Sequence, residues 1–163
     1  MAQRRGGVRC TAVALLWAWV AMVFGSSALL VLAGVAGGGP GEARGLQGVL
    51  AATWRVADEV GPAAKILLIA AFAALVLAAE GPMERRAAGW RYAVNIGLGA
   101  AAMLLALALI PAGLSRGFGI GLTGARLDLS TLPFYLAGGV LGAVVFTASA
   151  ARCRGRVLRA SGV

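Results

Sequence analysis

The chain has 163 residues, of which 60 % are hydrophobic and 13 % charged, and it carries 15 basic and six acidic residues for a net charge of +9. It contains no histidine, which excludes imidazole ligation of haem, zinc or iron and acid–base catalysis by histidine. A basic chain can bind nucleic acid, but here the basic residues lie beside long apolar stretches, where anionic lipid and membrane orientation account for them. We therefore expect the lipid bilayer, and no nucleic acid, among the partners.

Four long apolar stretches dominate the sequence, at residues 11–36, 63–79, 92–114 and 132–151. A bilayer core about 30 Å thick needs about 20 apolar residues per helix, which is the length that these stretches offer. Ionisable side chains lie only near their ends. The sequence predicts an all-α integral membrane protein in which four transmembrane helices pack as a bundle. Residues 1–163 are expected to form one four-span membrane domain.

The first span, 11–36, follows a basic tail that contains Arg4, Arg5 and Arg9. Its apolar run is longer than the roughly 7–15 residues of the apolar region in a secretory signal peptide. We therefore expect it to remain in the protein as a membrane anchor.

An amphipathic segment follows at residues 45–60. Its apolar residues recur at helical spacing, whereas Gln47, Arg55 and Asp58 fall largely on another face. The segment is predicted to form a short interfacial helix that lies flat on the outer leaflet, with Trp54 at the level of the lipid headgroups. The alternative is a lid over a cavity between the spans.

The second and third spans, 63–79 and 92–114, are joined by a short connection at 80–91. This connection is predicted to be a tight hairpin without a functional site. Aromatic and basic residues of this kind mark the membrane interface. The predicted interfacial anchors are Trp54, Trp90, Tyr92, Arg85 and Arg86.

The connection at 115–131 contains a formal G-x-G-x-x-G motif at residues 119–124. In a dinucleotide-binding fold these glycines follow a strand and open a helix. No strand pattern precedes them here, and the motif lies in a short connection between two spans. We therefore reject nucleotide binding and expect no cofactor, no metal site and no catalytic residue.

Small residues repeat at intervals of four in the spans. Gly138 and Gly142 form a G-x-x-x-G pair whose face continues to Ser149, and Gly97 and Ala101 lie on a similar face of the third span. Small faces let helix backbones approach closely in lipid. We expect these residues to pack helices inside the bundle, and the alternative is a docking face for another membrane protein or a second copy of the chain.

The distribution of basic residues predicts the orientation. Ten Lys and Arg residues lie on the side of the N-terminal tail, the 80–91 connection and the C-terminal tail, and five lie on the other side. The positive-inside rule places the side with more basic residues in the cytoplasm, so both termini should be cytoplasmic. Cys10 and Cys153 would then face a reducing compartment, and two unpaired cysteines are expected there. The alanine- and arginine-rich composition favours a bacterial inner membrane.

Few polar side chains lie within the spans. Asn95, Ser26, Ser27 and Thr147 are the candidate lining of a polar path. The first hypothesis is a non-enzymatic accessory or scaffold subunit, or a self-associating helix bundle. The alternatives are a small transporter or channel component that uses this path, and a binder of lipid or another hydrophobic ligand. The layout is similar to that of small four-span subunits of some solute transporters, but no motif carries the resemblance, so it assigns no residue.

Overall fold

The computed structural model describes residues 2–37, 45–59, 61–83, 87–109 and 130–160. The regular structure in these ranges is helical and comprises α1 (Ala2–Ala36), α2 (Gly45–Glu59), α3 (Pro62–Met83), α4 (Ala88–Leu109) and α5 (Leu132–Ala160). Four of these helices, α1, α3, α4 and α5, are long and apolar enough to cross a membrane, as judged by length and composition. The motif at 119–124 lies outside the described residues.

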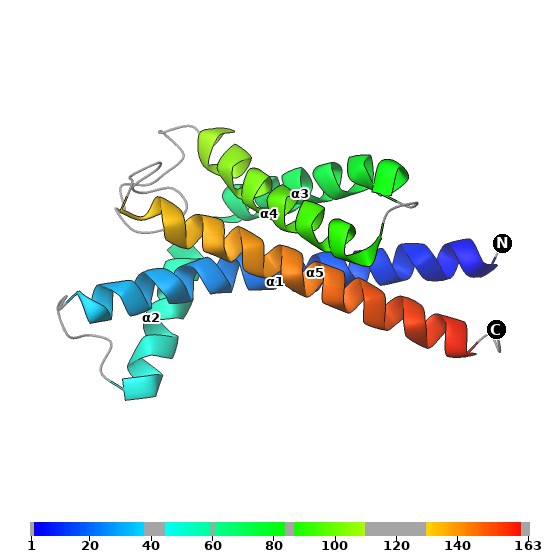
Figure 1. The fold of residues 1–163 in the computed structure, drawn as a ribbon. Helices are drawn as coiled ribbons and strands as arrows, with labels where there is room; N and C mark the ends of the chain where they lie inside the picture. The colour runs from blue at the N-terminus through cyan, green and yellow to red at the C-terminus, as the bar shows by residue number, and fades with distance from the viewer. Residues whose placement is uncertain (1, 38–44, 60, 84–86, 110–129, 161–163) are drawn as a thin grey trace.

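The longest helices, α1 and α5, form an antiparallel pair. Cys10 meets Cys153 near one end of the pair, and Ser26 meets Gly138 sixteen residues further along α1. In each contact the residue numbers of the two partners add to nearly the same total, as expected for two helices that run antiparallel. At 1.5 Å per residue the contact therefore extends over about 24 Å. Both chain ends lie at the same end of this pair (Figure 1).

Helix α4 packs on another face of α5 and is also antiparallel to it. Gly99 lies against Gly139, and Asn95 bonds to Thr147 further along α5. Helix α5 therefore contacts both α1 and α4, and small residues on two of its faces make both contacts close. Gly138 and Gly139 are adjacent in the sequence, so they lie about 100° apart around α5. One glycine can therefore face α1 while the other faces α4.

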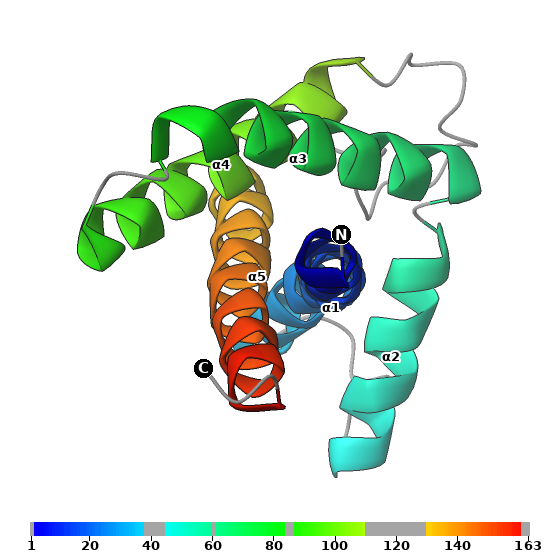
Figure 2. The ribbon, with the colours of Figure 1, turned by 90° about the vertical axis from the view of Figure 1, so that its right-hand side faces the viewer.

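Helices α2 and α3 run across the α1–α5 pair rather than along it. Figure 2 shows α1 nearly end-on, with α2 and α3 seen along their lengths. Helix α3 is linked to α1 by the indole Nε1 of Trp19, which donates to the backbone carbonyl of Lys65 at 3.1 Å. Helix α2 is held to α1 by a tilted contact between the rings of Phe24 and Trp54, with centroids 5.5 Å apart. The helices are thus not the near-parallel set that the word bundle usually denotes.

The core lies where α1, α3, α4 and α5 converge. Phe72 of α3 and Phe146 of α5 meet edge to face there, with ring centroids 5.6 Å apart. Such aromatic pairs add to the dispersion energy of close packing. The largest fully buried apolar side chains are Tyr135, Phe72, Met22, Leu68, Met103, Leu107 and Val76.

Several helices continue beyond the predicted spans. Helix α1 begins at Ala2 rather than at 11, α3 ends at Met83 rather than at 79, and α5 ends at Ala160 rather than at 151. A predicted span ends where charged residues begin, but the added residues of α1 and α5 include arginine and alanine, which are good helix formers, so the backbone stays helical there. The extension of α3 consists of Glu80, Gly81, Pro82 and Met83, and helix propensity does not explain it. The amphipathic helix was placed well, since α2 covers 45–59. Gly61 then adopts a φ of 73°, and Pro62 begins α3.

Candidate functional site

The pair Gly138 and Gly142 lies against α1. A Cβ atom at Gly138 would come within 2.7 Å of the Cβ of Ser26, and one at Gly142 would come within 2.8 Å of the carbonyl oxygen of Ala18. Cβ atoms essentially never approach so closely, so these positions require glycine at the present helix separation. Within this chain the pair therefore serves the α1–α5 contact.

Of the predicted serines, Ser26 lies in this same α1–α5 contact, where it faces Gly138, and Ser27 is the next residue of α1. Ser26 and Ser27 are 2 % and 1 % exposed. The hydroxyl of Ser26 donates to the carbonyl of Met22 at 2.8 Å, and that of Ser27 donates to the carbonyl of Val23 at 2.8 Å. Both hydroxyl groups thus bond to their own helix backbone, which is the usual way for serine to be accommodated in an apolar helix.

Asn95 and Thr147 lie together between α4 and α5. The Nδ2 of Asn95 donates to the hydroxyl oxygen of Thr147 at 3.0 Å, and that hydroxyl donates to the carbonyl of Ala143 at 2.9 Å. Asn95 is 7 % exposed, and its Oδ1 accepts no hydrogen bond from the residues that the structure describes. The structure therefore brings together Asn95 and Thr147 but keeps Ser26 and Ser27 apart from them, on the α1 side of α5.

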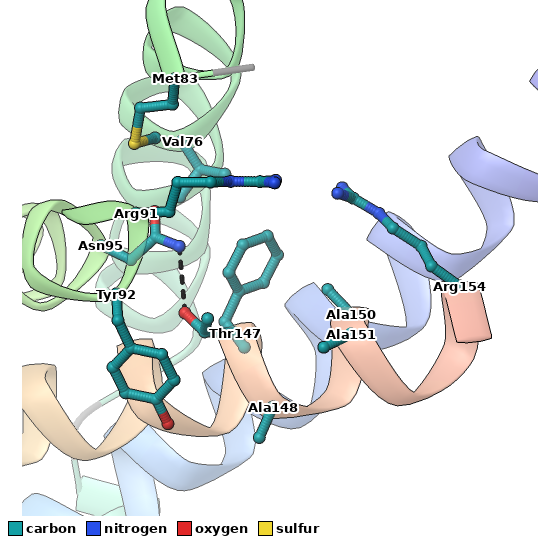
Figure 3. A pocket seen from close by; sticks show the side chains of 11 residues that line it. Val76, Met83, Arg91, Tyr92, Asn95, Thr147, Ala148, Ala150, Ala151 and Arg154 are labelled. Carbon is teal, nitrogen blue, oxygen red and sulfur yellow. Dashed lines mark hydrogen bonds between the residues drawn. The ribbon is translucent and has the colours of Figure 1, made fainter. Parts of the chain in front are cut away.

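A pocket of about 300 Å³ opens beside Asn95. Figure 3 shows the guanidinium groups of Arg91, from α4, and Arg154, from α5, pointing toward one another across it. The remainder of the wall is mainly apolar, and among the described residues that form it none is acidic. The lining consists of Val76, Met83, Arg91, Tyr92, Asn95, Phe146, Thr147, Ala148, Ala150, Ala151 and Arg154.

The other small residues singled out from the sequence have different surroundings. Ser149 lines a second pocket, between α1 and α5, together with Trp17 and Arg152. Gly97 is exposed, and a Cβ atom there would meet nothing within 4 Å, while Ala101 is half-buried. Gly97 thus makes none of the close helix contacts that Gly138 and Gly142 make.

The predicted aromatic anchors are on the surface. Trp54 is 66 % exposed, Trp90 58 % and Tyr92 37 %. Arg85 and Arg86 lie outside the described residues. Trp90 and Tyr92 sit at the start of α4, next to Arg91, so the pocket opens beside a pair of exposed aromatic side chains.

The expectation of two unpaired cysteines is wrong for this structure. Cys10 and Cys153 form a disulfide that joins α1 to α5, with their Cα atoms 5.5 Å apart. The expectation was drawn from the predicted compartment alone. It could not take account of the antiparallel register of α1 and α5, which places the two thiols side by side.

The pocket between Arg91 and Arg154, the two-arginine pocket, was not predicted from the sequence. Arg91 and Arg154 were counted only as orientation signals, and they are 63 residues apart in the chain. The contact between Gly99 and Gly139 was missed for a similar reason, because it joins glycines from two helices rather than a pair within one. A signal was nevertheless present for the pocket, since Arg91 and Asn95 are four residues apart and so share a face of α4.

Comparison with known proteins gives no relative for this chain: no family model, no curated protein and no solved structure matches it.

Proposed function

We propose that this protein is a non-enzymatic integral membrane protein of a bacterial inner membrane that acts as an accessory or scaffold subunit, with both termini in the cytoplasm. The four long apolar helices support the membrane location. The surplus of basic residues on the side of the termini supports the orientation.

The observation that best supports an accessory role is the small-residue stripe on α4. Ala93 and Gly97 are exposed and Ala101 is half-buried, at the spacing that lets one helix backbone approach another. Gly138, Gly139 and Gly142 of α5 already lie in close contacts inside the chain, whereas Gly97 has open space before it. A partner helix could therefore approach α4 closely without any change in the fold.

The transporter or channel alternative has less support. It would need a continuous polar path, but Ser26 and Ser27 lie on the α1 side of α5, and their hydroxyl groups bond to the α1 backbone. The lipid-binding alternative depends on a different feature, the pocket beside Asn95, and is compatible with an accessory role.

Purification of the tagged protein in mild detergent, followed by mass spectrometry and native sizing, tests the accessory role. We expect a stoichiometric partner with the wild type and its loss in Gly97→Ile, because the longer side chain would hold a partner helix away from α4. Gly34→Ile is the matched control, since Gly34 is also exposed on a helix and a Cβ atom there would meet nothing within 4 Å. A wild-type protein that purifies alone as a monomer would count against the accessory role.

A further inference from the structure

The second pocket, between α1 and α5, is larger than the one beside Asn95. Its volume is about 650 Å³, within the range for ligand sites. The antiparallel register that pairs Cys10 with Cys153 also brings Trp17 of α1 to the level of Val145 of α5. The wall of this α1–α5 pocket includes Val13 and Trp17 of α1 and Val145, Ser149, Arg152 and Arg156 of α5.

The wall of the α1–α5 pocket changes from apolar to cationic along α5. Ser149 follows Val145 by about one turn, and Arg152 and Arg156 lie about 10 Å and about 16 Å beyond Val145 along the helix axis. The arginines are nearer the end of the molecule that carries the chain termini (Figure 1). This is the order of chain and phosphate in a phospholipid that lies along a membrane helix with its headgroup at the interface.

The cationic part of the pocket consists of Arg152 and Arg156, which are four residues apart and share a face of α5. Both are exposed, and neither forms an ion pair or a hydrogen bond with a residue that the structure describes. Like charges at this spacing repel one another. A phosphate group between them would lower this repulsion and could accept N–H donors from both guanidinium groups.

Ser149 differs from the other hydroxyl residues of the spans. The hydroxyl groups of Ser26, Ser27 and Thr147 each donate to the carbonyl four residues earlier in their own helix. The hydroxyl of Ser149 makes no hydrogen bond within the described part of the chain, although Ser149 lines the pocket and is only partly exposed. It is therefore available to donate to a phosphate oxygen one turn from Arg152.

The apolar part of the pocket is suited to hydrocarbon. Val13 and Trp17 are one turn apart on α1, and they are 51 % and 57 % exposed. Val145 completes this surface from α5. An acyl chain that begins at Ser149 and runs away from the chain termini would cover these three side chains.

The surroundings of the pocket select against a headgroup that carries an ammonium group. Neither α1 nor α5 contains an acidic residue. An ammonium group beside the phosphate would lie near two arginines with no carboxylate from these helices to pair with it, and placing like charges together is costly. An anionic phospholipid without an ammonium group avoids this cost.

We propose that the α1–α5 pocket binds an anionic phospholipid of the leaflet that faces the chain termini. Arg152, Arg156 and the hydroxyl of Ser149 hold its phosphate, and an acyl chain lies against Trp17 and Val145. Basic pockets between membrane helices are suited to such headgroups. This inference rests on the proposed membrane insertion but not on the accessory role. Carbonate extraction of membranes tests insertion separately from the binding measurement.

The binding test uses delipidated protein in a nonionic detergent, with dissociation constants from native mass spectrometry. The probes are phosphatidylglycerol, phosphatidylethanolamine with the same acyl chains, and glycerol phosphate, which has no chain. We expect phosphatidylglycerol to bind about tenfold more tightly than phosphatidylethanolamine, and glycerol phosphate to bind least. Arg152→Gln and Arg156→Gln should each weaken phosphatidylglycerol binding about tenfold, as expected for the loss of a charged hydrogen-bonding partner.

Matched variants separate a built site from general charge attraction. Arg91→Gln removes the same charge from the same end of the molecule, but Arg91 lines the two-arginine pocket, so binding should change less than twofold. Ser149→Ala should weaken binding about fivefold through the loss of one hydrogen bond. Ser27→Ala removes a hydroxyl that bonds to its own helix, and it should leave binding within about twofold. Thermal unfolding checks that each variant is folded.

Three results would overturn the proposal. One is equal phosphatidylglycerol binding by the wild type and by folded Arg152→Gln and Arg156→Gln proteins. Another is an equal loss of binding in Arg91→Gln, or equal binding of the two lipids, either of which would indicate attraction without a selective site. The third is glycerol phosphate binding as tightly as phosphatidylglycerol, which would identify a site for a soluble phosphate in place of a lipid site.

Discussion

At the scale of single residues, glycines two positions apart on α4 have opposite surroundings. A Cβ atom at Gly99 would come within 2.7 Å of the Cβ of Ala143, and it would also meet the backbone of Gly139. A Cβ atom at Gly97 would meet nothing within 4 Å. The backbone of a neighbouring helix cannot move aside as a flexible side chain can, so one methyl group at Gly99 must push α4 away from α5.

We expect Gly99→Ala to destabilise the protein by about 1–3 kcal/mol, the usual cost of overpacking a well-packed site. Gly97→Ala should leave stability unchanged or raise it slightly, because alanine is the better helix former. Thermal unfolding in mild detergent, followed by tryptophan fluorescence, measures both. Equal melting temperatures for the two variants would show that α4 and α5 are less close than described here.

At the scale of elements, α2 has two apolar surfaces. Val56 and Ala57 are buried toward the remainder of the protein, whereas Leu46, Leu50 and Trp54 are 76 %, 60 % and 66 % exposed. The exposed three recur at intervals of four and so form one stripe along the helix. A stripe of this size on a water-soluble surface would be unfavourable, and the interfacial location expected for this helix would account for it.

Spin labels at two adjacent positions of α2 test the interfacial location. Leu50 lies on the exposed apolar stripe, and Ala51 is also exposed but about 100° further around the helix. In a variant that lacks both cysteines, a label at position 50 should be more accessible to oxygen than to a water-soluble nickel chelate. A label at position 51 should show the reverse. Ready access of the nickel chelate to both labels would place α2 in water.

The sequence predicts the helices better than it predicts their contacts. Hydropathy predicts the apolar helices because the signal for each helix lies within about 20 consecutive residues. The helical spacing of apolar residues predicts α2 for the same reason. The convergence of Arg91, Asn95 and Arg154 depends instead on the register between α4 and α5. That register is set by Gly99 against Gly139, a contact between residues 40 positions apart that leaves no periodic signal.

At the scale of the whole molecule, the α1–α5 pair brings the two ends of the chain together. The basic N-terminal and C-terminal tails continue these helices, and Cys10 and Cys153 join them at the end where the tails begin. The positive-inside rule and the disulfide lead to opposite expectations for this end. Ten basic residues favour the reducing cytoplasm, whereas a stable disulfide favours an oxidising compartment.

The redox state of the pair in living cells therefore reports the orientation of the whole protein. If the termini face the cytoplasm, as proposed from the charge distribution, the cell should keep both thiols reduced, and the bond between Cys10 and Cys153 should form once a mild oxidant is added to isolated membranes. A membrane-permeant maleimide that adds mass to each thiol measures the first state. A protease site introduced between α4 and α5 measures the second, because the two fragments stay joined on a non-reducing gel only when the bond has formed. Cys10→Ser is the control that must release the fragments.

Cysteines that resist the maleimide in cells until a reductant is added would place both termini outside the cytoplasm, and the arginines of the tails would then need an explanation other than orientation. The bond between α1 and α5 would persist in that case as a permanent link between the ends of the chain.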